Sequence, residues 1–192
     1  MNNKTLIFLF IRYISLAIFA IGNLYLFYLI FTPLTYFSSL WAIKTLYIEN
    51  FSYAMGGFNL DAGNLISLVS INGRTINANI IPACIAGAAY YLLTIFNLTT
   101  PMKVYKRIGS LFFILGIFFL LNTTRIIIFM IILINGNINF FDIAHSTSWY
   151  FGSTVLIILI WFANVLIFRI RAIPVYTDLK NLLKEATKSK PF

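Results

Sequence analysis

The sequence predicts an all-α polytopic membrane protein with about four transmembrane helices and a small extracytoplasmic hairpin or interfacial segment. Hydrophobic residues make up 60% of the 192 residues and charged residues only 10%, whereas soluble domains carry about 25% charged residues. The mean hydropathy is +0.90, and several apolar runs reach the ~20 residues that a helix needs to cross a bilayer. We therefore expect a single integral membrane domain over residues 1–192.

Four apolar runs give the expected membrane spans, over residues 5–31, 80–98, 108–134 and 149–168. The first run is longer than the ~7–15-residue apolar core of a secretory signal, and no small-residue cleavage site follows it, so we interpret it as a retained helix. Pro33 is expected to end this helix, because proline lacks a backbone donor and its ring clashes with the preceding turn.

Residues 32–79 form the expected outer loop between the first two spans. Within this loop, residues 34–48 are apolar but short for a span, and Trp41 is typical of an interfacial helix. A β-prone run at residues 65–71 leads into Asn72-Gly73, which is a strong hairpin signal. A small hairpin is therefore predicted to cap the outer face.

The formal net charge is +9, and the positions of the basic residues predict the orientation, because basic loops favour the cytoplasmic side of a membrane. Both termini are expected in the cytoplasm, with residues 169–192 as a cytoplasmic tail, in a multi-pass protein of the cell membrane. This topology explains the charge, so no nucleic-acid partner is expected. Ten of the fourteen basic residues fall on the cytoplasmic side of the four-span arrangement: Lys4, Lys103, Lys106, Arg107, Arg169, Arg171, Lys180, Lys184, Lys188 and Lys190.

Cys84 is the only cysteine in the chain, so it forms no internal disulfide. Pro82 suits the first position of a helix, because its missing N–H has no intrahelical partner there. Cys84 would then lie in the first turn, where free N–H groups and the positive end of the helix dipole favour a thiolate. Gly87 and the neighbouring alanines leave room for another backbone to approach. The alternative is a buried cysteine that acts as a small hydrophobe.

Arg125 is the single charged residue of the apolar run 108–134. A charge inside a span costs at least ~2.5–3.5 kcal/mol at the middle of a helix and is usually functional or faces a cavity. Asn122 lies three residues earlier and is expected to share the same helix face. The alternative is that Arg125 lies close enough to the interface for its guanidinium to reach the headgroups.

His145 is the only histidine and lies in a polar connector, residues 139–148, before the last span. Histidine changes its charge near neutral pH, which makes it a candidate proton carrier. The alternative is an ordinary surface histidine. With both termini in the cytoplasm, the four-span arrangement brings Cys84, Arg125 and His145 to the outer membrane face.

These three residue types supply complementary chemistry. Cysteine is a covalent nucleophile, histidine an acid and base, and arginine a donor to a carbonyl or oxyanion. One cysteine and one histidine exclude a zinc tetrad, a haem ligand pair and an iron–sulfur cluster built from this chain alone. We therefore expect no metal and no cofactor.

Three short motifs, in this order along the chain, resemble the exosortase/archaeosortase family, and its compact archaeal members in particular. They are Ala83-Cys84-x-x-Gly87 at the start of a span, Asn122-x-x-Arg125 near the outer end of the next span, and His145 before the last span. The resemblance covers roughly residues 78–165 and depends on the order and membrane placement of the motifs. The chain departs from the longer bacterial exosortases in lacking their additional N-terminal spans.

The resemblance implies a cysteine transpeptidase or endopeptidase, analogous to sortase on an unrelated fold. By this resemblance Cys84 is the nucleophile, Arg125 stabilises the substrate carbonyl and His145 transfers the proton. Asn122 and Gly87 are candidate substrate-positioning residues. The implied substrates are exported proteins with a C-terminal motif, a transmembrane helix and a basic cluster, with a membrane lipid as a candidate acceptor.

Two other classes of function stay open at this point. A non-enzymatic membrane scaffold or assembly factor would bind partners through the outer hairpin and the interfacial helix. A small transporter is a weaker alternative, because no inverted repeat is visible in the sequence. A discontinuous helix pair would favour a transporter.

Overall fold

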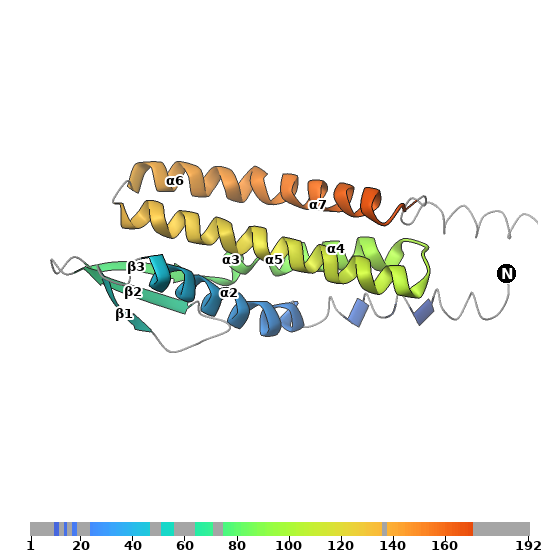
Figure 1. Ribbon diagram of the computed structural model, residues 1–192, viewed down its shortest axis with the longest axis horizontal. Helices are drawn as coiled ribbons and strands as arrows, with labels where there is room; N and C mark the ends of the chain where they lie inside the picture. The colour runs from blue at the N-terminus through green and yellow to red at the C-terminus, as the bar shows by residue number, and fades with distance from the viewer. Residues whose placement is uncertain are drawn as a thin grey trace, which may run out of the picture.

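The computed structural model describes residues 10–11, 14, 17–18, 24–46, 51–55, 64–70, 75–135 and 138–170, and for residues 51–55, 64–70 and 75–76 it describes the backbone alone. The described part is mostly helical, with a small sheet at one end of a helical bundle (Figure 1). In chain order the elements are α2 (Tyr25–Leu46), β1 (Phe51–Met55), β2 (Asn64–Ser70), β3 (Thr75–Ile80), α3 (Pro82–Ile85), α4 (Gly87–Thr99), α5 (Val104–Ile134), α6 (Ile138–Thr147), the π-helical segment η1 (Ser148–Gly152) and α7 (Ser153–Ile167).

Four of the described helical segments are long and apolar enough to cross a membrane, as the sequence predicts. They run antiparallel to one another along the chain, and the sheet lies at the end of the bundle where α5 ends and α6 begins (Figure 1). Because their number is even, α2 runs toward the sheet and α7 runs away from it (Figure 1). The four segments are Tyr25–Leu46, Pro82–Thr99, Val104–Ile134 and Ile138–Ile167.

The prediction that Pro33 ends the first helix is wrong, because α2 continues through Pro33 to Leu46. Proline removes one backbone hydrogen bond from a helix, but in an apolar bundle the neighbouring helices stabilise such a segment. Phe31, two residues before the proline, stacks on Tyr90 of α4 with 3.6 Å between the ring centroids. Residues 34–46 therefore belong to a candidate span and not to an interfacial helix, while most of the predicted span 5–31 lies outside the described residues.

The prediction of an all-α fold is also corrected, since the described residues include a three-stranded antiparallel sheet of order β1-β2-β3. The pair of β2 and β3 is the predicted hairpin: Val69 pairs with Thr75 and Leu65 with Asn79. Its turn, Asn72-Gly73, lies outside the described residues. β1 was not predicted. It pairs with the other edge of β2 and leaves β2 as the central strand.

Helix α5 is the centre of the bundle and packs against α2, α4, α6 and α7. One stripe of its buried side chains recurs every fourth residue. Each step of four residues rotates the stripe by about 40° around the helix, because a turn takes about 3.6 residues. The stripe therefore faces different neighbours at the two ends of α5. Its members are Ser110, Ile114, Phe118, Asn122, Ile126, Met130 and Ile134.

Candidate active site

Cys84 lies where the sheet meets the bundle. β3 ends at Ile80, and α3 begins at Pro82, which occupies the first helical turn as predicted. The backbone N–H of Cys84 donates to the carbonyl of Ile81 at 2.9 Å, so this N–H is not free. The side chain of Cys84 is partly exposed, and the cysteine is a free thiol.

The predicted second span is not one continuous helix. α3 has only four residues, and Ala86 then adopts the left-handed conformation (φ 59°, ψ 48°) before α4 begins at Gly87. A non-glycine residue in this region costs roughly 1–2 kcal/mol, and such strain tends to cluster at functional sites. The sequence predicts that the dipole of a long helix favours a thiolate at Cys84. That reason does not apply, because α3 has only four residues and carries little of the dipole of a long helix.

Gly87 has a packing role in this break. A Cβ atom added at Gly87 would lie 2.7 Å from the ring of Tyr28 on α2, so the glycine lets this ring pack directly on the backbone of α4. The sequence predicts that small residues here leave room for another backbone, whereas at Gly87 the space is taken by a tyrosine ring. Gly87 is buried and is not among the residues that line the cavity described below, so its predicted contact with substrate has no support from its position.

Asn122 holds the backbone of the cysteine segment. Its amide Nδ2 donates to the carbonyl of Cys84 at 3.0 Å and to that of Ile85 at 3.4 Å. The break at Ala86 leaves these carbonyls without the partners that a continuing helix would supply. The side chain of Asn122 is 1% exposed, and its Oδ1 has no hydrogen-bond partner. Asn122 is therefore a positioning residue for Cys84.

Arg125 lies one turn further along α5. Its Nη1 donates to Oγ of Ser153, the first residue of α7, at 2.9 Å. Its Nε is buried and has no hydrogen-bond partner. Arg125 thus links α5 to α7 through its hydrogen bond to Ser153. The alternative, in which the guanidinium reaches only the lipid headgroups, does not account for this bond.

His145 lies on a helix, because the predicted polar connector folds as α6 and continues through η1 into α7. Apolar residues recur along this segment at the spacing of one helix face. The segment folds as a helix packed on α5, although its polar composition suggested a loop. The imidazole stacks on Phe141, with 5.4 Å between ring centroids and 10° between planes, and meets the edge of Phe129 on α5. These two aromatic rings fix the orientation of His145.

The π-helical segment η1 sets the phase between His145 and Ser153. Eight residues of regular α-helix would place these two side chains about 80° apart around the axis, whereas one extra residue taken up in a π turn reduces this to about 20°. Both side chains contact α5, His145 at Phe129 and Ser153 at Arg125. A π segment in this position is typical of functional sites.

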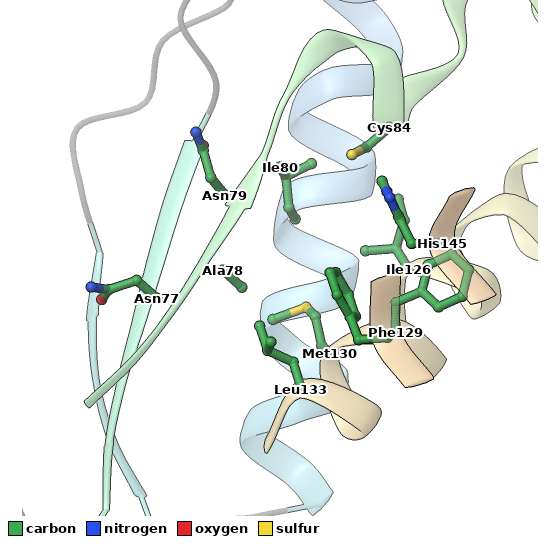
Figure 2. A pocket seen from close by; sticks show the side chains of 11 residues that line it. Asn77, Ala78, Asn79, Ile80, Cys84, Ile126, Phe129, Met130, Leu133 and His145 are labelled. Carbon is green, nitrogen blue, oxygen red and sulfur yellow. The ribbon is translucent and has the colours of Figure 1, made fainter. Parts of the chain in front are cut away.

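Cys84 and His145 line one cavity of about 300 Å³. Figure 2 shows the imidazole of His145 directed toward the side chain of Cys84 at one end of this cavity. The walls are mainly apolar and come from β3, α3, α5 and α6, and Arg125 is not among the lining residues. The lining residues are Asn77, Ala78, Asn79, Ile80, Cys84, Ile126, Phe129, Met130, Leu133, Phe141 and His145.

Sequence reasoning missed several residues of this site. Ser153 gave no signal beyond a serine near the start of an apolar run, and its contact with Arg125 depends on helix packing. Phe129 lies four residues after Arg125 on α5, a spacing that puts both on one helix face, and this could have been noticed. Asn77 and Asn79 alternate with apolar residues along a strand, which was a second available signal.

Within the described ranges, no group of three or more histidine, cysteine, aspartate and glutamate side chains could hold a metal ion. The arrangement instead offers a thiol, an imidazole and a guanidinium around an apolar cavity. No family model, no curated protein and no solved structure matches this chain. The family resemblance therefore depends on the motifs of the sequence alone.

Proposed function

We propose that this protein is a membrane-embedded cysteine transpeptidase or endopeptidase that cleaves C-terminal sorting signals of exported proteins at the outer membrane face. One observation supports it most strongly. Cys84 and His145 line one cavity, and Arg125 lies one helical turn after Asn122, whose amide binds the carbonyl of Cys84. A nucleophile, a proton carrier and a cation are thus gathered from three separate elements, α3, α6 and α5.

In the proposed reaction His145 takes the proton of the Cys84 thiol, and Sγ attacks the carbonyl carbon of the scissile peptide bond. The C–N bond then breaks, and the new amine leaves on the helix-bearing fragment with the proton from His145. A thioester joins Sγ to the rest of the substrate. An amine or hydroxyl of a membrane lipid, or water, attacks this thioester, gives its proton to His145 and releases the thiol.

Arg125 stabilises the negative charge that develops on the carbonyl oxygen. Ser153 accepts from Nη1, and because Arg125 does not line the cavity in this structure, its guanidinium reaches an oxyanion there by turning toward Cys84. Preorganised donors to an oxyanion are worth about 10²–10³-fold in kcat in known acyl-transfer sites. A role in orienting the substrate backbone uses the same donors, and a kinetic test that separates the two roles follows in the Discussion.

Mass spectrometry of an exported protein that ends in a motif, a transmembrane helix and a basic cluster tests this function. In cells that carry the wild-type chain, the helix should be removed. With Cys84→Ala the helix-bearing precursor should accumulate while the protein stays in the membrane. Thr45→Ala is the matched control, because Thr45 is exposed and its hydroxyl bonds only to the carbonyl of Trp41 in its own helix. Hydroxylamine should trap the wild-type thioester and leave a hydroxamate at the new C-terminus of the substrate.

Processing that persists with Cys84→Ala, in cells without a second such enzyme, would contradict the proposal. A scaffold or assembly factor would then be the better account, since it predicts that substitutions at Cys84, Arg125 and His145 leave function unchanged. The structure does contain one discontinuous helix, at Ala86, but within the described part of the chain no second helix is broken by a left-handed residue. A transporter built on a pair of broken helices therefore gains no support.

The proposed orientation places the sheet end of the bundle outside the membrane. Lys103, Lys106 and Arg107 lie at the opposite end, in and after the connection between α4 and α5, where basic residues favour the cytoplasm. Because Cys84 is the only cysteine, a membrane-impermeant maleimide reports its location directly. Labelling of intact cells from outside is expected, whereas labelling only of inverted vesicles would overturn the orientation and the site of action with it.

A further inference from the structure

The strand that leads to Cys84 has a free edge. Within the described part of the chain, β3 pairs with β2 on one side only. Four consecutive residues of this strand, residues 77–80, line the cavity, and the chain then passes through Ile81 into α3 and Cys84. Figure 2 shows the lining side chains of α5 to one side of β3 and the neighbouring strand to the other. The free edge therefore runs in line with the thiol.

The two faces of β3 differ in chemistry. Ala78 and Ile80 point toward the α5 side of the cavity, near Met130, whereas Asn77 and Asn79 point to the opposite side (Figure 2). Ile80 is buried and both asparagines are exposed. This alternation follows from the period of two of an extended strand.

We infer that β3 is the substrate-binding strand: the extended segment of the exported protein directly before the scissile bond pairs with the free edge of β3. The inference rests on the proposed function and names its mode of substrate recognition. An edge strand presents a row of unpaired N–H and C=O groups, and an extended peptide that adds to such an edge gains main-chain hydrogen bonds.

The size of the cavity favours a short peptide segment as the occupant. Its volume of about 300 Å³ lies at the lower end of the ~300–1,000 Å³ that is usual for ligand pockets. A few extended residues fit such a space, and a folded domain does not. The cavity also ends at the proposed nucleophile, so a peptide that lies along β3 brings its carbonyl groups successively toward Cys84.

The direction of the substrate strand follows from topology. The transmembrane helix of the substrate comes after the scissile bond, so the substrate enters from the sheet end and continues along the bundle. β3 and α4 run in the same direction, from the sheet toward the connection near Lys103. The substrate segment is therefore parallel to β3, with the evenly spaced hydrogen bonds of a parallel pair.

The difference between the two faces of β3 then determines which side chains the substrate presents. Alternate substrate residues face the apolar wall formed by Phe129, Met130 and Leu133, and the residues between them face the side of Asn77 and Asn79. The recognised motif should therefore alternate apolar and polar residues before the scissile bond. Pockets for alternate side chains are how strand addition generally achieves specificity.

Disulfide crosslinking tests the inference in a chain that binds but does not cleave. Cys84→Ser leaves the protein without cysteine, and Asn77→Cys or Asn79→Cys then supplies one thiol on β3. The substrate carries single cysteines at successive positions before the scissile bond. Each β3 thiol should crosslink to every second substrate position. The preferred position should shift by two residues toward the substrate N-terminus when Asn77→Cys replaces Asn79→Cys. Thr45→Cys, on the exposed face at the end of α2, should give no crosslink.

Each outcome of this scan decides the inference. Crosslinks without a period of two, or a shift in the opposite direction, overturn the parallel strand pairing. If Asn77→Cys or Asn79→Cys with Cys84 retained no longer processes substrate, the scan is repeated from Ala78→Cys, which should select the intervening positions. Absence of crosslinks from all three, in cells where processing still requires Cys84, overturns the substrate-binding strand and leaves the proposed function standing. Processing that does not require Cys84 overturns the function itself.

Discussion

Two polar residues of the same buried stripe on α5, Ser110 and Asn122, have different kinds of partner. At Ser110 the partners are side chains: Asn97 of α4 donates to the Ser110 hydroxyl at 2.7 Å, and this hydroxyl donates to Asn164 of α7 at 2.8 Å. All three side chains are fully buried. The chain of hydrogen bonds ties three helices together at the end of the bundle away from the sheet.

At Asn122 the partners are backbone carbonyls. Twelve residues of α-helix, about 18 Å, separate this residue from Ser110. Its amide binds the carbonyls of Cys84 and Ile85, next to the strained residue Ala86. The cavity and the free thiol of Cys84 lie close by, and the partly buried Arg125 follows one turn later on α5.

The difference shows how buried polar groups in one helix serve two purposes. Buried side chains that hydrogen-bond to one another, as around Ser110, fix the packing of helices, and the backbone there keeps regular helical geometry. A side chain that binds the carbonyls of a broken helix maintains a backbone shape that would otherwise be costly. The Ser110 region is therefore expected to control stability, and the Asn122 region to control the reactivity and placement of Cys84.

The largest expected effect is the loss of the nucleophile. Cys84→Ala should reduce processing by at least about 10³-fold, as removal of a covalent nucleophile does in related chemistry. The melting temperature of the purified protein should stay close to that of the wild type, because the thiol is partly exposed and free. Measured rates and thermal unfolding in detergent check both statements. A large fall in melting temperature would indicate a structural cysteine instead.

The next largest effect is expected at Asn122. Asn122→Ala removes the donor to the carbonyls of Cys84 and Ile85, which costs about 1–3 kcal/mol, or about 5–150-fold in rate if the cost appears in the transition state. The rate at which a maleimide labels Cys84 should change with it, because the cysteine segment loses its fixed position. Thr123→Ala is the matched control: Thr123 is the next residue, is also buried, and its hydroxyl has no hydrogen-bond partner. Equal effects of both substitutions would contradict a positioning role for Asn122.

Ser110→Ala tests the other region. It removes the hydroxyl between two buried amides and should lower the free energy of unfolding by about 1–2 kcal/mol, with no change in processing per folded molecule. Thr94→Ala is the control, because Thr94 is buried but its hydroxyl binds only the carbonyl of Tyr90 in its own helix. If Ser110→Ala reduces processing without lowering the melting temperature, the distinction between the two regions fails.

Much of this architecture could be predicted from composition and local patterns, because these act over short stretches of chain. The apolar runs predicted the later three candidate spans, whereas the predicted first span, 5–31, overlaps Tyr25–Leu46 only over residues 25–31. Pro82 marked the start of α3, and Asn72-Gly73 predicted the hairpin of β2 and β3. The break at Ala86 could not be predicted, since alanine favours a continuous helix. The energetic cost of its left-handed backbone is offset by contacts with other helices, such as the hydrogen bonds of Asn122 to the neighbouring carbonyls. The passage of α2 through Pro33 is likewise a tertiary effect.

The candidate site was predictable in its residue types and less so in its geometry. The placement of Cys84, Arg125 and His145 near one end of the bundle follows from the spans and their order. Their supporting contacts do not, because the Asn122 amide and the Ser153 hydroxyl are brought in by packing between helices distant in sequence. Polar residues of this kind are common in apolar helices, so the sequence alone does not distinguish those that support a site.

The smallest expected effect is at Ser153, and it separates the two roles of Arg125. Ser153→Ala removes one acceptor of the guanidinium and should cost about 1 kcal/mol, which is roughly fivefold in rate. If Arg125 stabilises the oxyanion, the loss should appear in kcat, because that interaction exists only in the transition state. If Arg125 orients the substrate backbone, KM should rise with kcat unchanged. Ser153→Thr keeps the hydroxyl and should restore most of the activity. Failure of this rescue, together with a fall in melting temperature, would mean that Ser153 supports the packing of α7 on α5 and not the position of Arg125.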